Sequence, residues 1–385
     1  MQKQKSLSFF ICPPGSVPAL LIFFLACLFK IEANAQGQLT VPHSGGNRKA
    51  TVSELLGLTK LELTYNRPGV RGREGKIWGT NVVHYGLKNQ GFGSSKAAPW
   101  RAGANENTTF LTSSAVNIEG QRLSPGKYGV FMIAGENQTT VIFSRNSGSW
   151  GSFFYDSTED ALRVTVKNEK LSAPVEWLKY EFIRQTDTSV TVALMWENRL
   201  IPFTITADVY RLQLESFRQE LRTEPGFIWQ SYEQAASYCL MHNIEFEQGL
   251  VWAEESISGV VGQKNFKTLS TKAALLAKLN RTKESELIMK EAIPMGNLLE
   301  LHEYAKSLLK QNNGQAAFEV FNLNYRNHPD QLTTNIGLAR GYAALGNFKL
   351  ALKYMRSALK QVPNESSATI IRDLITKLEA RQNIN

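Results

Sequence analysis

Polar and aromatic side chains gather between residues 66 and 107, a stretch rich in Gly, Arg and Asn and without a regular hydrophobic period. A guanidinium group is a planar fork of donors that suits carboxylate, phosphate and sulfate groups. Indole rings stack on sugar faces, and amide and carboxylate groups hydrogen-bond hydroxyls. The candidate ligand-binding residues are Arg67, Arg71, Arg73, Trp78, Trp100, Arg101, Asn105 and Glu106. Together they predict a site for a small anionic or glycan-like ligand.

The same residues also fit a purely structural interpretation. A Trp-Arg pair beside Gly and Asn can pin a long loop onto a β-domain. Trp100 would then fill the end of the core, and Arg101 would bridge backbone carbonyls and Glu106. The sequence leaves both interpretations open.

Catalytic signals are weaker than binding signals. The five histidines (His43, His84, His242, His302 and His328) form no metal-binding helix motif, so we expect neither a metal nor another cofactor. A Gly-x-Ser-x-Gly elbow is absent, and the loop 91–95 lacks the lysine of a phosphate-binding loop. Two carboxylates, Glu106 and Asp156, could serve a glycosidase, and His84 could act as a base. We therefore favour a non-enzymatic protein and keep a hydrolase acting on envelope polysaccharide as the alternative.

The elements that position these residues read as short strands from about residue 36 to 207. Leu61, Leu63 and Tyr65 alternate with polar residues, and similar alternation recurs up to Ile205. Turn-forming groups separate the runs, including Ser124-Pro125-Gly126 and Glu197-Asn198-Arg199. Strands this close leave no room for crossover helices, so we expect an antiparallel, jelly-roll-like β-sandwich. The stretches 66–107 and 144–160 are predicted to be long irregular connections, which are usually either functional or mobile, and a site is expected there.

Several segments of this region resemble a bacterial family catalogued as Domain of Unknown Function 2911. They are 65–73 (YNRPGVRGR), 100–106 (WRAGANE), 123–128 (LSPGKY) and 194–197 (LMWE), and the similarity covers about residues 40–207. The resemblance implies an exported bacterial protein, often with trailing helical repeats, and brings no established activity.

After residue 207 the hydrophobic period becomes helical. Residues 208–227 predict a linking helix stopped by Pro225-Gly226, and 228–385 predict tetratricopeptide-like hairpins. Pro329 and Pro363 stand 34 residues apart, the length of that repeat, and small residues such as Ala339 recur at matching positions. This architecture predicts α+β organisation with a scaffold that binds a protein or peptide partner. A helical cap that merely packs on the sandwich is the alternative.

The first 35 residues predict export. Lys3 and Lys5 precede an apolar run over 19–29, and Ala33-Asn34-Ala35 is a signal-peptidase pattern with cleavage after Ala35. The run is shorter than the ~20 residues of a membrane span, and Cys27 lies in a poor lipobox. We therefore expect a periplasmic or secreted protein with no transmembrane segment after cleavage.

The charge and cysteine content bear on which partners the protein can bind. The net charge of +9 is spread along the chain without a basic stripe interleaved with aromatics, so we expect no nucleic acid. Cys239 is predicted to be a buried small hydrophobe. The sequence as a whole predicts an exported envelope binding or scaffold protein, in which the sandwich binds a small ligand and the repeats bind a protein. The hydrolase and a purely structural interaction protein remain the alternatives.

Overall fold

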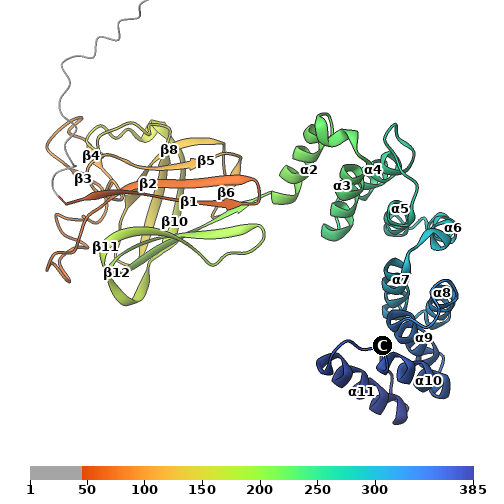
Figure 1. Ribbon diagram of the computed structural model, residues 1–385. Helices are drawn as coiled ribbons and strands as arrows, with labels where there is room; N and C mark the ends of the chain where they lie inside the picture. The colour runs from red at the N-terminus through yellow and green to blue at the C-terminus, as the bar shows by residue number, and fades with distance from the viewer. Residues whose placement is uncertain (1–45) are drawn as a thin grey trace, which may run out of the picture. The chain divides into compact units, whose positions relative to one another are not determined.

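The computed structural model describes residues 46–385. The predicted signal peptide and its cleavage point lie outside the described residues. Two antiparallel sheets are followed by helices, as the sequence predicted, so the fold class is confirmed (Figure 1). No helix in the described part of the chain is long and apolar enough to cross a membrane.

The β-region contains a six-stranded sheet, a four-stranded sheet and a two-stranded ribbon. The strand orders are β1-β2-β5-β8-β9-β10, β11-β12-β6-β7 and β3-β4. The strands are β1 (Arg48–Leu56), β2 (Thr59–Arg67), β3 (Lys88–Asn89), β4 (Ala97–Ala98), β5 (Thr108–Thr112), β6 (Val116–Ile118), β7 (Gln121–Leu123), β8 (Gly126–Ile133), β9 (Gln138–Ser144), β10 (Asp160–Lys167), β11 (Glu169–Ile183) and β12 (Ser189–Ala207).

The two large sheets share one apolar core. Along β10, Leu162, Val164 and Val166 are buried while the residues between them are exposed or half-buried, the alternation expected when one sheet face meets water. Ring contacts cross between the sheets: Tyr65 meets Tyr180 with centroids 4.8 Å apart, and Phe143 of β9 meets Phe203 of β12 at 5.7 Å. The sheets therefore pack face to face.

The turn predicted at Glu197-Asn198-Arg199 is wrong. β12 continues through these residues, and Glu197 adopts a left-handed conformation with φ 54°. The pairing moves from Val175↔Glu197 to Lys179↔Met195, four residues along β11 but two along β12. A β-bulge absorbs such a mismatch without ending the strand. The extra residues lie on β11, between Val175 and Lys179, so the polar residues of β12 lie opposite a bulge.

The helical region begins directly after β12. Its α-helices are α2 (Val209–Glu220), α3 (Trp229–His242), α4 (Phe246–Ser258), α5 (Phe266–Lys278), α6 (Thr282–Ala292), α7 (Leu298–Lys310), α8 (Gly314–Asn327), α9 (Leu332–Ala344), α10 (Phe348–Leu359) and α11 (Glu365–Glu379). Pro225 and Gly226 lie in a separate 3-10 turn, Glu224–Phe227, so α2 ends before them. Consecutive helices from α3 to α10 form hairpins, and α11 follows the last hairpin.

Asparagine side chains cap the starts of several helices, and small residues allow the helices to pack closely. Side chains of asparagine accept backbone N–H groups at five helix starts, at Asn265, Asn297, Asn313, Asn347 and Asn364. Small residues let neighbouring helices approach: a Cβ on Gly337 of α9 would lie 2.6 Å from the Phe321 ring of α8. The repeat pattern in the sequence thus reflects helix–helix packing.

Candidate functional site

The segment Gly69–Arg73 is docked on β11. Val70 N–H donates to the Glu176 carbonyl at 2.9 Å, and Arg71 N–H donates to Glu176 Oε1 at 3.0 Å. The Arg71 guanidinium lies over the Trp177 ring, 5.6 Å from its centroid. Arg71 is exposed and Trp177 is 38% exposed. These two side chains therefore present a cation and an aromatic face on one surface.

The two neighbouring arginines support the loop. Arg67 Nε donates to the Leu178 carbonyl at 3.0 Å. Arg73 donates to the Val70 carbonyl at 2.9 Å and to the Gly69 carbonyl at 2.7 Å. Bonds from a charged donor to backbone carbonyls fix a loop strongly. Of the three predicted arginines, Arg71 is the exposed one.

A second predicted group surrounds the buried Asn66. Asn66 Nδ2 donates to Glu106 Oε2 at 2.6 Å, and Asn105 Nδ2 donates to Asn66 Oδ1 at 3.4 Å. Lys49 Nζ lies 3.9 Å from Glu106 Oε1. Arg101 Nη1 donates to the Asn105 carbonyl at 3.0 Å, and burial lowers the pKa of Arg101. The Arg101–Asn105–Glu106 segment is thus held as one hydrogen-bonded loop.

The two predicted tryptophans, Trp78 and Trp100, contact each other and pack toward the core. Trp100 is 6% exposed and stacks on Trp196, with centroids 6.3 Å apart and an interplanar angle of 14°. Trp78 meets both rings edge-on, at 5.8 and 6.1 Å. Its face is covered by Arg199, 4.4 Å away, which also donates to the Gly135 carbonyl at 2.8 Å. Trp100 therefore follows the core interpretation, and it offers no free face for a ligand.

Known proteins resemble parts of this chain. Residues 47–205 match the family described as "Protein of unknown function (DUF2911)". The resemblance predicted from the sequence is confirmed. No curated protein matches the chain. One solved structure, "Crystal structure of YrrB: a TPR protein with an unusual peptide-binding site", covers 43% of this chain and 84% of that chain, at 14% sequence identity and a TM-score of 0.30.

Within the DUF2911 match, the two irregular stretches meet where Phe92 contacts Phe153 and Phe154. These three residues and Trp150, which is near Phe153 in the sequence, are defined here as the aromatic tip. Three of these rings are more than half exposed: Phe92 at 63%, Trp150 at 58% and Phe154 at 59%. Phe92 contacts the rings of Phe153 and Phe154 with centroids 5.3 and 6.2 Å away. The Arg101 guanidinium lies 5.0 Å from the Phe153 centroid. Clustered exposed aromatics are a common mark of a contact surface.

Sequence reasoning did not single out the aromatic tip. The available signal was aromatic residues among Gly and Ser in both irregular stretches, but only the fold shows that they meet. Gly93 makes the approach feasible, since a Cβ there would lie 2.3 Å from the Phe153 carbonyl oxygen. Ser94 N–H donates to that same oxygen at 2.9 Å.

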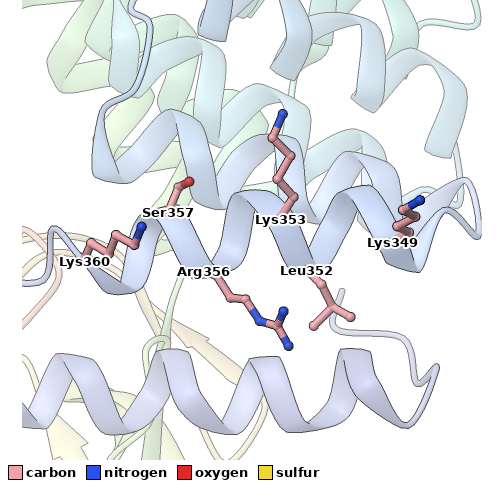
Figure 2. Close-up of a pocket in the computed structure, with 6 residues that line it drawn as sticks. All are labelled: Lys349, Leu352, Lys353, Arg356, Ser357 and Lys360. Atoms are coloured by element: carbon pink, nitrogen blue, oxygen red, sulfur yellow. The ribbon is translucent and has the colours of Figure 1, made fainter.

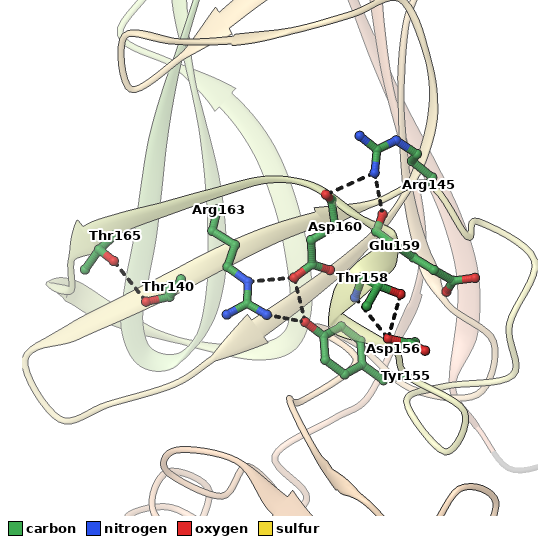
Figure 3. Close-up of polar contacts among 9 residues, drawn as sticks. All are labelled: Thr140, Arg145, Tyr155, Asp156, Thr158, Glu159, Asp160, Arg163 and Thr165. Atoms are coloured by element: carbon green, nitrogen blue, oxygen red, sulfur yellow. Dashed lines mark hydrogen bonds and ion pairs between the residues drawn. The ribbon is translucent and has the colours of Figure 1, made fainter.

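The carboxylates considered for hydrolysis have other contacts. Asp156 Oδ1 accepts Thr158 N–H at 2.9 Å and caps a 3-10 turn (Figure 3). Glu106 Oε2 accepts Asn66 Nδ2–H. Nearby, Asp160 Oδ2 accepts the Tyr155 hydroxyl at 2.7 Å and Arg163 Nε at 2.6 Å. Burial and the Asp160 contact raise the pKa of Tyr155. These bonds fasten the 144–160 stretch to β10.

The remaining titratable candidates are His84, which contacts a backbone carbonyl through one ring nitrogen, and the buried Cys239. His84 Nδ1 lies 3.1 Å from the Gly86 carbonyl, and burial lowers its pKa. Cys239 is fully buried, as predicted, and burial raises its pKa to about 11. Within residues 46–385, no three His, Cys, Asp or Glu side chains are grouped so as to hold a metal ion.

The helical region carries a separate polar groove along α10, the α10 groove. Figure 2 shows its lining residues on successive turns of the helix: Lys349, Leu352, Lys353, Arg356, Ser357 and Lys360. Its volume is about 440 Å³. Arg356 and Leu352 point toward the neighbouring helix, and Arg356 Nη2 donates to Glu379 Oε1 of α11 at 2.8 Å. All six lining residues lie on α10 or at its C-cap, and Lys353 points to the side of α10 away from Leu352 and Arg356 (Figure 2).

The α10 groove has a large excess of positive charge. Residues 346–363 contain four Lys or Arg residues and no Asp or Glu. The acidic residues of α11 are already paired: Glu365 with Arg372, Asp373 with Lys377 and Glu379 with Arg356. Among the described residues, Lys349, Lys353 and Lys360 have no carboxylate within 4.0 Å. This is a concentrated, uncompensated cationic surface.

Proposed function

We propose that this chain is a binding scaffold whose helical repeats hold a protein partner through an acidic segment of that partner. The observation that carries the proposal is the α10 groove, with three lysines unmatched by acidic neighbours. Complementary charge favours encounter and orientation of an anionic partner. The family description names no activity, so the proposal depends on this surface.

The dimensions of the groove favour a polypeptide over a small anion. Lys349 of α10 and Lys360 at the C-cap of that helix are eleven residues apart, which corresponds to roughly 16 Å along the axis. A single phosphate or carboxylate is far shorter than this span. Lysine side chains are flexible and carry a compact charge, so they can pair with carboxylates that are irregularly spaced. A chain segment with several Asp or Glu residues matches both properties.

A defined peptide tests this function. We expect a fluorescein-labelled decaglutamate peptide to bind the full chain, as measured by fluorescence anisotropy. Replacing Lys349, Lys353 and Lys360 by Glu should weaken binding about tenfold or more, because each exposed pair contributes about 0.2–1 kcal/mol. The control replaces two lysines of another helix, Lys283 and Lys290 of α6, by Glu and should retain binding.

Two outcomes would contradict this function. One is equal loss of binding in the α6 control. The other is binding of the unmodified chain to vesicles of phosphatidylglycerol with no binding of the peptide, which would assign the groove to a lipid surface. Added salt should weaken genuine peptide binding, since exposed charges are screened over about 8–10 Å at physiological ionic strength.

Ligand binding by the β-region is a second proposed function. The observation that favours it is the exposure of the aromatic tip beside Arg101, together with the exposed Arg71–Trp177 pair. Flat rings and a guanidinium suit a small anionic or glycan-like ligand. A glycan-array screen of the full chain, repeated with Trp150→Ala, tests it. Absence of binding would leave the β-region with a structural role.

Export is the proposed setting for both functions. Its support is the Lys3/Lys5 charge, the apolar run over 19–29 and Ala33-Asn34-Ala35. Intact-mass analysis of protein recovered from the periplasm or medium should give a chain that begins at Gln36. A chain that retains residues 1–35, or one lipidated at Cys27, would overturn it.

A further inference from the structure

The segment Gln382–Asn385 folds back onto α9. Arg340 of α9 donates from Nη1 to the Ile384 carbonyl at 2.6 Å. In return, Asn385 Nδ2 donates to the Arg340 carbonyl at 3.2 Å. Figure 1 marks this end of the chain beside α9. The segment is therefore held by two hydrogen bonds: the Arg340 guanidinium donates to its main chain, and the Arg340 carbonyl accepts from the Asn385 side-chain amide.

An apolar pocket holds the side chain between these bonds. Ile384 is 7% exposed and belongs to a cluster that includes Ala339 and Ala343 of α9 and Leu378 of α11. The small alanines leave space on α9 for a branched side chain. Arg340 is half-buried, and a charge-assisted hydrogen bond is strong where water is partly excluded. Main-chain recognition beside a side-chain pocket is how extended peptides are commonly bound.

We propose that α9 carries a peptide-binding subsite, built from Arg340, Ala339 and Ala343, which the chain's own Gln382–Asn385 segment occupies. Its external ligand is an extended segment of another protein with a branched aliphatic residue followed by asparagine. The subsite shares no lining residue with the α10 groove. The external segment can then bind only when it displaces the chain's own segment.

The probe for this subsite is an amidated, fluorescein-labelled peptide with the sequence of residues 380–385. We expect it to bind a chain that lacks residues 382–385. It should bind the full chain about tenfold or more weakly, because a tethered competitor acts at millimolar effective concentration. A peptide with Asp in place of its isoleucine should not bind. Arg340→Gln in the shortened chain should weaken binding about tenfold, as expected for loss of a charge-assisted bond.

A second variant separates recognition from folding. Ile384→Asp in the full chain should expel the segment without deleting it, and this chain should bind the probe as the shortened chain does. The proposal would be overturned if the shortened chain is folded but does not bind the probe. So would loss of the cooperative thermal transition in both variants, because the segment would then be an integral part of the α9–α11 core. Retention of decaglutamate binding in these variants keeps this result separate from the function proposed for the α10 groove.

Discussion

Trp100 and Trp196 stack in the core of the β-region, with ring centroids 6.3 Å apart and planes inclined by 14°. Both belong to sequence segments that carry the family resemblance. Their rings lie where β12 and the 66–107 stretch meet, and Trp78 contacts both rings. The tryptophans therefore join the long loop to the sheet.

Replacing Trp100 by Ala should destabilise the fold by about 3–5 kcal/mol, because a large buried ring is lost and a cavity remains. Urea unfolding followed by circular dichroism measures this change. Trp150→Ala is the matched control: its side chain is 58% exposed, so the change should stay within about ±0.5 kcal/mol. Similar costs for both variants would be inconsistent with the burial described.

Replacing Arg71 and Arg73 in separate variants should show which of the two side chains stabilises the loop. Arg73→Ala removes two bonds to backbone carbonyls and should cost about 1–3 kcal/mol of stability. Arg71→Ala loses the contact over Trp177, which at an exposed site is worth about 0.5–1 kcal/mol. Thermal melts of the two variants check this order. The reverse order would show that Arg71 supports the loop.

The buried Glu233 offers a test of the packing between α3 and α5. Its carboxylate is 2% exposed, accepts the Ser237 and Thr271 hydroxyls at 2.6 and 3.0 Å, and pairs with Lys267 Nζ at 2.6 Å. Lys267→Met should cost about 1–3 kcal/mol, because a buried charge loses its counterion. Lys306→Met removes an exposed pair with Glu303 and should cost less than about 1 kcal/mol. Chemical denaturation of both variants decides the matter, and equal costs would refute the role of burial.

His302 should give the helical region a measurable pH dependence. Burial lowers its pKa to about 4 from the usual 6.5, so on acidification the unfolded chain binds this proton before the folded chain does. Its contribution to stability is complete at pH 7 and is lost as the pH falls from about 6.5 to about 4. We expect a loss of about 2 kcal/mol, reduced from the full linkage value because the ring is partly exposed.

The control for this prediction is His302→Gln. The free energy of unfolding should fall less steeply between pH 7 and pH 5 in this variant than in the natural chain. Denaturant titrations across that range provide the comparison. Identical pH profiles would show that His302 is not the group responsible.

The sequence predicted those features that repeat along the chain. Apolar alternation identifies strands such as β10 because each strand buries one face. The spacing of Pro329 and Pro363 identifies hairpins because each repeat packs the same way against its neighbour. The polar residues of β12 opposite the β11 bulge could not be distinguished from a turn, since polar residues suit both. That distinction depends on β11 pairing across the bulge.

The candidate sites were less predictable because they depend on contacts distant in sequence. Arg67, Arg71 and Arg73 look equivalent along the chain, but Arg67 supports the loop through the Leu178 carbonyl of β11, while Arg73 bonds to carbonyls of its own loop. The aromatic tip needs two stretches to meet, and Arg340 meets Ile384 only after α11 turns back. The lysines of α10 were visible as residues, but their lack of acidic partners depends on how α11 pairs its own charges.

Zero-length crosslinking tests the central claim most directly. A carbodiimide joins a lysine ammonium to a carboxylate only when the two are in contact, so it records where decaglutamate lies on the full chain. Peptide mapping by mass spectrometry should place the crosslinks at Lys349, Lys353 and Lys360, and added salt should reduce them. Crosslinks concentrated at lysines of other helices, such as Lys283 and Lys290, or spread evenly over the chain, would contradict the assignment of the α10 groove as the partner-binding surface.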